Sequence, residues 1–165
     1  MRRQFPTDST GNVYLAERTD PPAAAQAADL AYLGASANAY KPVYSKLTNA
    51  AADDWSDLIN LTNVLANTPN ATYKTAVSNV IDVDNWLRYF AVNTLLDNNS
   101  PTLSAGIGND FYLVRGNTDT RFEIVPFDLD SLAGRGASPG STTAGLFRAA
   151  ALPQLDRLLK SADFA

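Results

Sequence analysis

Cysteine and histidine are both absent from the 165 residues of this chain. Their absence excludes thiolate and imidazole zinc sites, haem ligation through those side chains, and catalysis by a cysteine or by a serine–histidine pair. It also excludes a disulfide scaffold but leaves the cellular compartment open. The metal ligands that remain are carboxylate and amide oxygens, for which Mg²⁺, Mn²⁺ and Ca²⁺ are the plausible metals.

Positive charge is also scarce, because 13 Lys and Arg stand against 17 Asp and Glu, a formal net charge of −4. We therefore expect neither a nucleic-acid-binding surface nor binding to acidic lipid. No run of about 18 apolar residues is present, so we expect no membrane span. No apolar segment follows Met1-Arg2-Arg3, and we expect no secretory signal in these residues.

The composition that is present, 45% hydrophobic and 18% charged, is typical of a folded protein. With this length it predicts one domain over residues 1–165. Helices are expected over residues 53–67, over 72–80 with Asn70 as the cap, and over 152–160. Residues 13–16 are a candidate strand, and because a strand needs a partner we expect further sequence before Met1.

The strongest helical pattern covers residues 84–97, and its apolar stripe is broad enough to predict a central, mostly buried helix. The stripe consists of Trp86, Leu87, Phe90, Ala91, Thr94 and Leu95, widened by Tyr89, Val92 and Leu96.

The remainder of the chain is organised around residues 109–131. Two β-branched and aromatic runs, 111–114 and 122–125, flank a turn at 116–119, which predicts a hairpin. Asp128 and Asp130 follow its second strand and would project to the same side if the backbone stays extended. Before the hairpin we expect a flexible loop over 102–108, and after it a mobile Gly-, Ser- and Thr-rich loop over 133–143.

Polar residues at the hairpin entrance include Asp97, Asn98 and Asp110, so both ends of the hairpin carry oxygen ligands that could hold a hard cation. Asp128 and Asp130 could equally be ordinary exposed acids. Asn98 is as compatible with a turn as with a nucleotide contact.

The order of helix, polar loop, hairpin and Asp resembles the catalytic half of a protein kinase. Five sequence motifs make the resemblance more specific: Gly11–Tyr14 (GNVY), Asp82–Leu87 (DVDNWL), Leu95–Asn98 (LLDN), Asn109–Leu113 (NDFYL) and, most specific, Phe122–Asp130 (FEIVPFDLD). Together they resemble the CotH kinase family of spore-coat-type proteins. The resemblance extends from about Gly11 to the C-terminus.

The resemblance implies an atypical protein kinase that transfers phosphate from ATP to Ser or Thr of coat or secreted proteins, using a divalent metal. It also implies an α+β fold, a mainly helical protein-kinase-like C-lobe with a small β-hairpin that carries the metal-site carboxylates. The implied location is extracellular, or the cell or spore surface of a bacterium. By position, Asp128 and Asp130 match the family's metal-binding pair, and Asp128 would also contribute to nucleotide binding. Asp110 matches a metal-binding Asn of the family.

Two positions depart from the family pattern. Ser100 stands where the catalytic Asp is expected, and a hydroxyl cannot replace the carboxylate that orients and deprotonates the acceptor. Asp97 or Asp110 could take over that role. The exchange of Asn for Asp at position 110 is tolerable, because both side chains offer an oxygen to a hard cation.

A nucleotide-clamping part with an ATP-contacting Lys is not recognisable, and we expect it to be missing from these residues. Two interpretations therefore stay open. One is an active kinase; the other is a catalytically degenerate module, either binding a partner or serving as a Ca²⁺-stabilised structural domain of an exported bacterial protein. The oligomeric state is not predicted.

Overall fold

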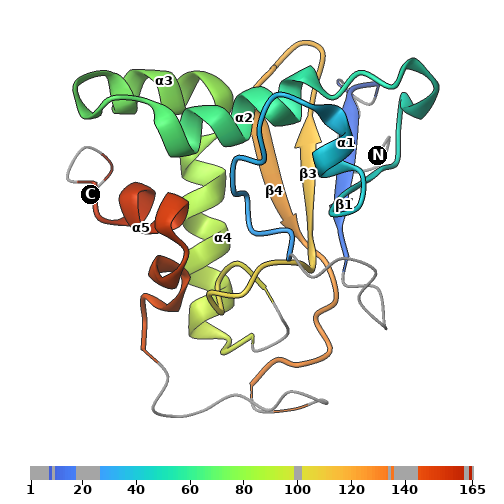
Figure 1. Ribbon diagram of the computed structural model, residues 1–165. Helices are drawn as coiled ribbons and strands as arrows, with labels where there is room; N and C mark the ends of the chain where they lie inside the picture. Colours follow the sequence, from blue (N-terminus) through green and yellow to red (C-terminus); the bar gives the residue numbers. More distant parts are fainter. Residues whose placement is uncertain are drawn as a thin grey trace.

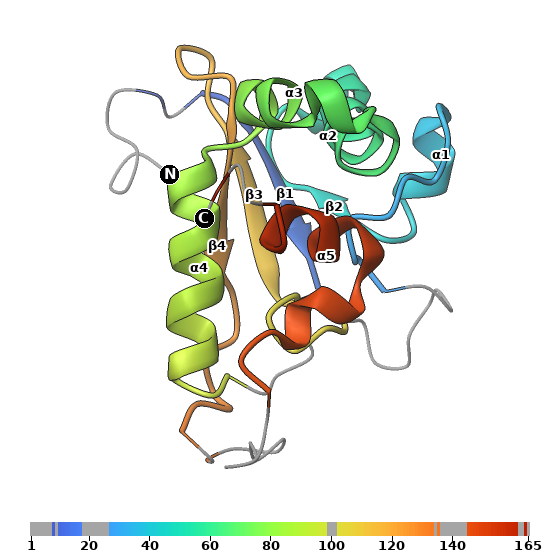
Figure 2. The ribbon, with the colours of Figure 1, turned by 90° about the vertical axis from the view of Figure 1, so that its left-hand side faces the viewer.

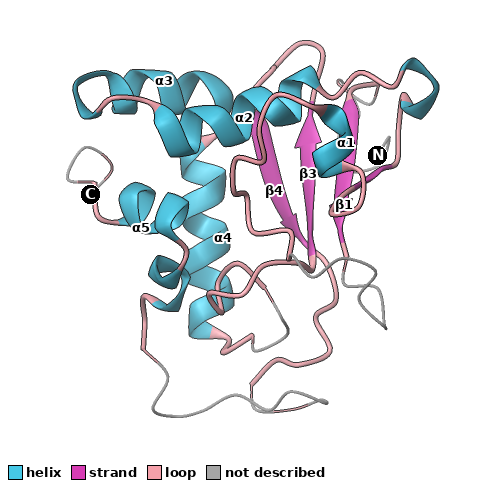
Figure 3. Cartoon of the chain, in the orientation of Figure 1, coloured by secondary structure: helices cyan, strands magenta, loops and turns pink. Residues whose placement is uncertain are grey.

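The computed structural model describes residues 8, 10–17, 27–98, 102–133, 135, 145–161 and 164. Short 3₁₀ turns lie at Ala50–Ala52, Asn70–Thr72 and Arg148–Ala151. The helices and strands (Figure 3) are, in chain order, β1 (Asn12–Ala16), α1 (Ala37–Tyr40), β2 (Ser45–Lys46), α2 (Ser56–Asn67), α3 (Tyr73–Val80), α4 (Val83–Leu95), β3 (Phe111–Arg115), β4 (Phe122–Pro126) and α5 (Pro153–Leu159).

The strands form one antiparallel sheet in the order β2-β1-β3-β4. The predicted hairpin is confirmed as β3 and β4, which pair from Phe111 opposite Pro126 to Arg115 opposite Phe122. The expected first strand is also confirmed. Its partners are β2 and β3, with Tyr14 opposite Leu113, so this strand is paired within the chain itself.

The hydrophobic core lies against one face of this sheet. Alternate residues of the strands point into it, as the two-residue period of a strand requires. Helices α2 and α3 lie together at one end of the sheet (top in Figure 1), and α5 contacts α2. The buried core residues include Tyr14, Phe111, Leu113, Phe122 and Ile124 from the sheet, and Leu58, Leu65, Trp86, Leu155 and Leu158 from the helices.

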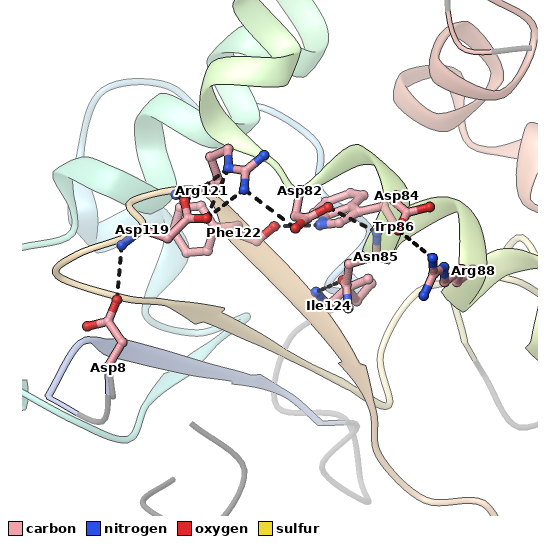
Figure 4. A network of polar contacts seen from close by, with 10 residues as sticks. All are labelled: Asp8, Asp82, Asp84, Asn85, Trp86, Arg88, Asp119, Arg121, Phe122 and Ile124. Atoms are coloured by element: carbon pink, nitrogen blue, oxygen red, sulfur yellow. Dashed lines mark hydrogen bonds and ion pairs between the residues drawn. The ribbon is translucent and has the colours of Figure 1, made fainter. Parts of the chain in front are cut away.

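Helix α4 runs alongside the edge strand β4 (Figure 2). Its first turn is capped by the Asp82 carboxylate, which accepts a hydrogen bond from the Asn85 N–H at 3.1 Å. Trp86 Nε1 then donates to the Phe122 carbonyl at 2.9 Å, and Asn85 Oδ1 accepts from the Ile124 N–H at 2.7 Å (Figure 4). Backbone groups on the outer edge of β4, which would otherwise be open for pairing, are thereby satisfied.

The prediction of a mostly buried central helix was wrong for α4. Trp86, Tyr89 and Phe90 are buried, but Val92 is 52% exposed and Leu95 is 79% exposed. The helix lies at the side of the sheet, so only one of its faces can be covered. The sequence stripe was too broad because it counted apolar residues on the outer face as well.

Two local predictions also need correction. Asn70 does not cap α3, because this helix begins after Thr72 and has no side-chain hydrogen bond at its N-cap. Asn70 Oδ1 instead accepts a hydrogen bond from Arg157 Nη2 at 2.7 Å. The loop over residues 102–108 is packed, with Thr102 and Leu103 fully buried. The Thr102 carbonyl accepts backbone hydrogen bonds from residues 107 and 108, both at 3.1 Å, which fold the loop into a compact turn.

Candidate functional site

Three segments that carry the predicted site residues meet at one end of the molecule. Figures 1 and 2 both show the C-terminal end of α4, the start of β3 and the end of β4 at this end. The Phe127 N–H donates to the Asp110 carbonyl at 3.1 Å, which joins the entrance of the hairpin to its exit. The Ala133 N–H donates to the Leu96 carbonyl at 2.8 Å, which ties the chain after the hairpin to the end of α4.

The backbone at this end is left-handed at several non-glycine residues, with φ of 47° at Asp97, 70° at Asn109, 55° at Asp110 and 53° at Asp128. Asn and Asp tolerate this region better than other residues, because their short side chains can bond locally. Backbone strain of this kind concentrates at functional sites. The extended backbone assumed for Asp128 and Asp130 is therefore not present.

Asp110 is buried, 7% exposed, at the entrance to β3. The preceding residue holds the chain in place, because Asn109 Oδ1 accepts from the Ala28 N–H at 2.9 Å and its own N–H donates to the Ala28 carbonyl at 3.0 Å. Burial raises the pKa of Tyr89 on α4, and the negative charge of Asp110 raises it further. Asp110 therefore lies within electrostatic reach of Tyr89 on α4.

Asp128 and Asp130 are both exposed after β4. Asp130 Oδ1 accepts a hydrogen bond from the hydroxyl of the buried Ser131 at 2.9 Å. Asp128 makes no hydrogen bond or ion pair with any residue that the structure describes. Of the two, Asp128 has the carboxylate with fewer competing interactions.

Asp97 and Asn98, at the end of α4, are held by other side chains. Asp97 Oδ1 forms an ion pair with Arg148 Nη2 at 3.0 Å, and both side chains are largely shielded from solvent. Asn98 is 1% exposed, and its Nδ2 donates to Asn93 Oδ1 at 2.9 Å. Asp97, predicted as a catalytic residue, and Asn98, predicted to bind the nucleotide, thus both contact other side chains of the protein. Ser100 lies outside the described residues.

Sequence reasoning missed Tyr89, Asn93 and Arg148. Tyr89 was counted as part of the apolar stripe of α4. Asn93 lies four residues further along the same buried face, and a polar residue in that position was a usable signal of a buried hydrogen bond. Arg148 offered no signal, because it pairs with Asp97 across 51 positions of sequence.

The described residues contain no group of three or more acidic side chains placed to hold a metal ion. Asp110, Asp128 and Asp130 therefore do not form a three-carboxylate cage. Their chemistry nevertheless fits Mg²⁺, because kinases supply few protein oxygens to it and phosphate and water supply the rest.

A family model described as CotH kinase protein matches residues 2–159. The chain belongs to the CotH kinase family. Membership indicates an atypical kinase-like domain, and the helices with a small antiparallel sheet are compatible with it. A comparison with curated protein sequences finds no match. None of the helices in the described part of the chain has the length and apolar character needed to cross a bilayer.

Proposed function

We propose that this CotH kinase domain transfers a phosphoryl group from ATP to Ser or Thr of proteins at a bacterial cell or spore surface, or of secreted proteins. The observation that supports this proposal best is the hydrogen bond from the Phe127 N–H to the Asp110 carbonyl, 3.1 Å long. It brings the segments of Asp110 and Asp128 together beside the end of α4, and protein kinases likewise hold Mg²⁺ with oxygen ligands from two separate segments.

Asp128 is the residue we assign to the metal, because its carboxylate is exposed and forms no ion pair among the described residues. Asp110 is the second candidate, since the hydrogen bond to Phe127 places its backbone next to the hairpin exit. Asp130 is partly committed to Ser131 and is the weaker candidate. Mg²⁺, when bound, would neutralise charge on the phosphate oxygens of ATP.

Activation of the acceptor hydroxyl is the step in which this chain departs from its family. Ser100 carries no carboxylate, and Asp97 is engaged by Arg148. Phosphoryl transfer depends mainly on positioning and electrostatic stabilisation, because its transition state is loose in most analyses. We infer that the serine slows transfer without abolishing it.

The test is transfer of radiolabelled phosphate from Mg²⁺–ATP to a peptide with several Ser and Thr residues. Asp128→Asn should lower the rate on the order of 100-fold, because it removes a negative charge that holds the metal ion against the phosphate oxygens. Asp84→Asn is the matched control, an exposed acid on α4 whose loss should leave the rate unchanged. Equal rates for Asp128→Asn and the wild type would exclude the metal role, and no transfer by the wild type would favour a degenerate module.

A further inference from the structure

Two aromatic side chains, Tyr112 and Phe127, pack together beside the exit of the hairpin. Their ring centroids are 5.2 Å apart and the ring planes are inclined at 78°, the edge-to-face arrangement that aromatic pairs favour. Tyr112 lies in β3 opposite Val125, whereas Phe127 follows Pro126, the last residue of β4. The ring contact therefore joins β3 to the segment that leaves β4.

This pair lies on the face of the sheet that is turned away from the hydrophobic core. Phe111 and Leu113, the neighbours of Tyr112 in β3, are core residues, so Tyr112 points to the opposite face. Neither Tyr112 nor Phe127 is fully buried. Tyr112 makes no hydrogen bond with any described residue, so its ring provides the contact with Phe127. Loss of this contact should leave the core packing in place.

Phe127 is also held by its backbone. Its N–H donates to the Asp110 carbonyl at 3.1 Å. The next residue, Asp128, has a φ of 53°, so the chain leaves the extended path of β4 immediately after Phe127. Phe127 is thus the residue through which Asp128 is attached to the sheet.

The two contacts of Phe127 restrain different motions. A single backbone hydrogen bond acts as a hinge, about which the segment can still rotate. The packing of the ring against Tyr112 adds a second point of attachment and removes that rotation. Asp128 forms no hydrogen bond or ion pair with a described residue, so its orientation depends on how Phe127 is held.

We propose that Tyr112 is a positioning residue for Asp128, which it holds, through the ring of Phe127, in the orientation that binds a divalent cation. This inference rests on the function proposed above, in which Asp128 binds Mg²⁺. A carboxylate that is already oriented loses less conformational freedom when it binds an ion, and its affinity is higher for that reason. Tyr112 acts only through Phe127 and does not contact the ion.

Titration with Mn²⁺ alone, as a stand-in for Mg²⁺, tests this role without nucleotide; the electron paramagnetic resonance signal of the free ion measures binding. Tyr112→Leu removes the ring but keeps apolar bulk. It should weaken Mn²⁺ binding about three- to tenfold, the range that the loss of an aromatic pair corresponds to. Phe127→Leu, which removes the other ring, should have the same effect. Tyr112→Phe keeps the ring and should bind like the wild type.

Val114→Ala is the matched control, because Val114 lies on the same face of β3, two residues further from the hairpin exit. It should lower the melting temperature and leave Mn²⁺ binding unchanged. Equal affinities for the wild type, Tyr112→Leu and Phe127→Leu, with weaker binding by Asp128→Asn, would overturn the positioning role alone. No Mn²⁺ binding by the wild type, or binding that Asp128→Asn does not weaken, would overturn the metal role of Asp128 as well.

The Mg²⁺ dependence of phosphate transfer provides a second measurement. Tyr112→Leu should raise the Mg²⁺ concentration that gives half the maximal rate. At saturating Mg²⁺ its rate should stay close to that of the wild type, because excess ion fills the weakened site. A rate lowered by the same factor at every Mg²⁺ concentration would indicate a merely structural role and would contradict the proposal.

Discussion

Trp86 Nε1 donates a buried hydrogen bond to the Phe122 carbonyl at 2.9 Å, and this contact fixes the first turn of α4 against the first residue of β4. The Asp82 N–H donates to the same carbonyl at 3.0 Å. α4 and β4 then run side by side (Figure 2). The contact at their first residues therefore sets where the C-terminal end of α4 lies relative to the exit of the hairpin. These contacts between the first turn of α4 and the start of β4 are called the anchor below. Substitutions that remove them should lower the stability of the whole domain.

Asn85→Ala tests the anchor without removing a large side chain. It deprives the Ile124 N–H of its acceptor at the edge of β4, and the free energy of unfolding should fall by about 1–3 kcal/mol. Urea denaturation measures the change. Arg88→Ala is the control, since it removes only an exposed ion pair and should cost about 0.5 kcal/mol or less. Equal stabilities for the two variants would show that the contact does not anchor the helix.

Asp97 and Arg148 should be energetically coupled. A double-mutant cycle with Asp97→Asn and Arg148→Met is expected to give a coupling energy of about 1 kcal/mol, because the ion pair is partly buried. Chemical denaturation of the four proteins provides the measurement. Zero coupling, together with loss of phosphate transfer in Asp97→Asn at unchanged stability, would instead make Asp97 the substitute for the missing catalytic Asp.

Asp119 should contribute to the pH dependence of stability. Hydrogen bonds from the Arg121 side chain, and then from its backbone N–H, lower the pKa of Asp119 from 3.8 to about 2. The stabilisation is therefore complete above pH 3.8 and is lost as the pH falls through that value towards 2. The side chain is 53% exposed, so solvent screening limits the effect to less than about 1 kcal/mol.

The melting temperatures of the wild type and Asp119→Asn, measured from pH 6 down to pH 2, test this expectation. The difference between them should be constant above about pH 4 and vanish near pH 2. A difference that grows as the pH falls would contradict the assigned pairing.

Substitution of Gly106 by alanine should destabilise the protein more than the same substitution at Gly34. Both residues have positive φ, 77° and 93°, so alanine would be strained at either position. At Gly106 a Cβ would also overlap the carbonyl oxygen of Arg148, whereas nothing lies within 4 Å at Gly34. Gly34→Ala should cost about 1–2 kcal/mol, and Gly106→Ala clearly more. Similar losses in thermal melting would show that the 102–108 loop is not packed as described.

The sequence by itself determined the elements whose signals are local. Residues 111–126 carry their own turn and strand patterns, so the hairpin was predictable, and the FEIVPFDLD segment after the turn identified the family. The placement of acids at both ends of the hairpin followed from chain order alone.

Only the tertiary structure decided the relationships between distant segments. β1 pairs with β3, α4 exposes Leu95, and Asp97 meets Arg148 across the domain. Apolar periodicity shows that a helix has a buried face, but it does not show how much of the helix other elements cover. The partner of a buried polar group depends on which segments the core brings together, so the contacts of Asp97 and Asn98 appear only in the folded chain.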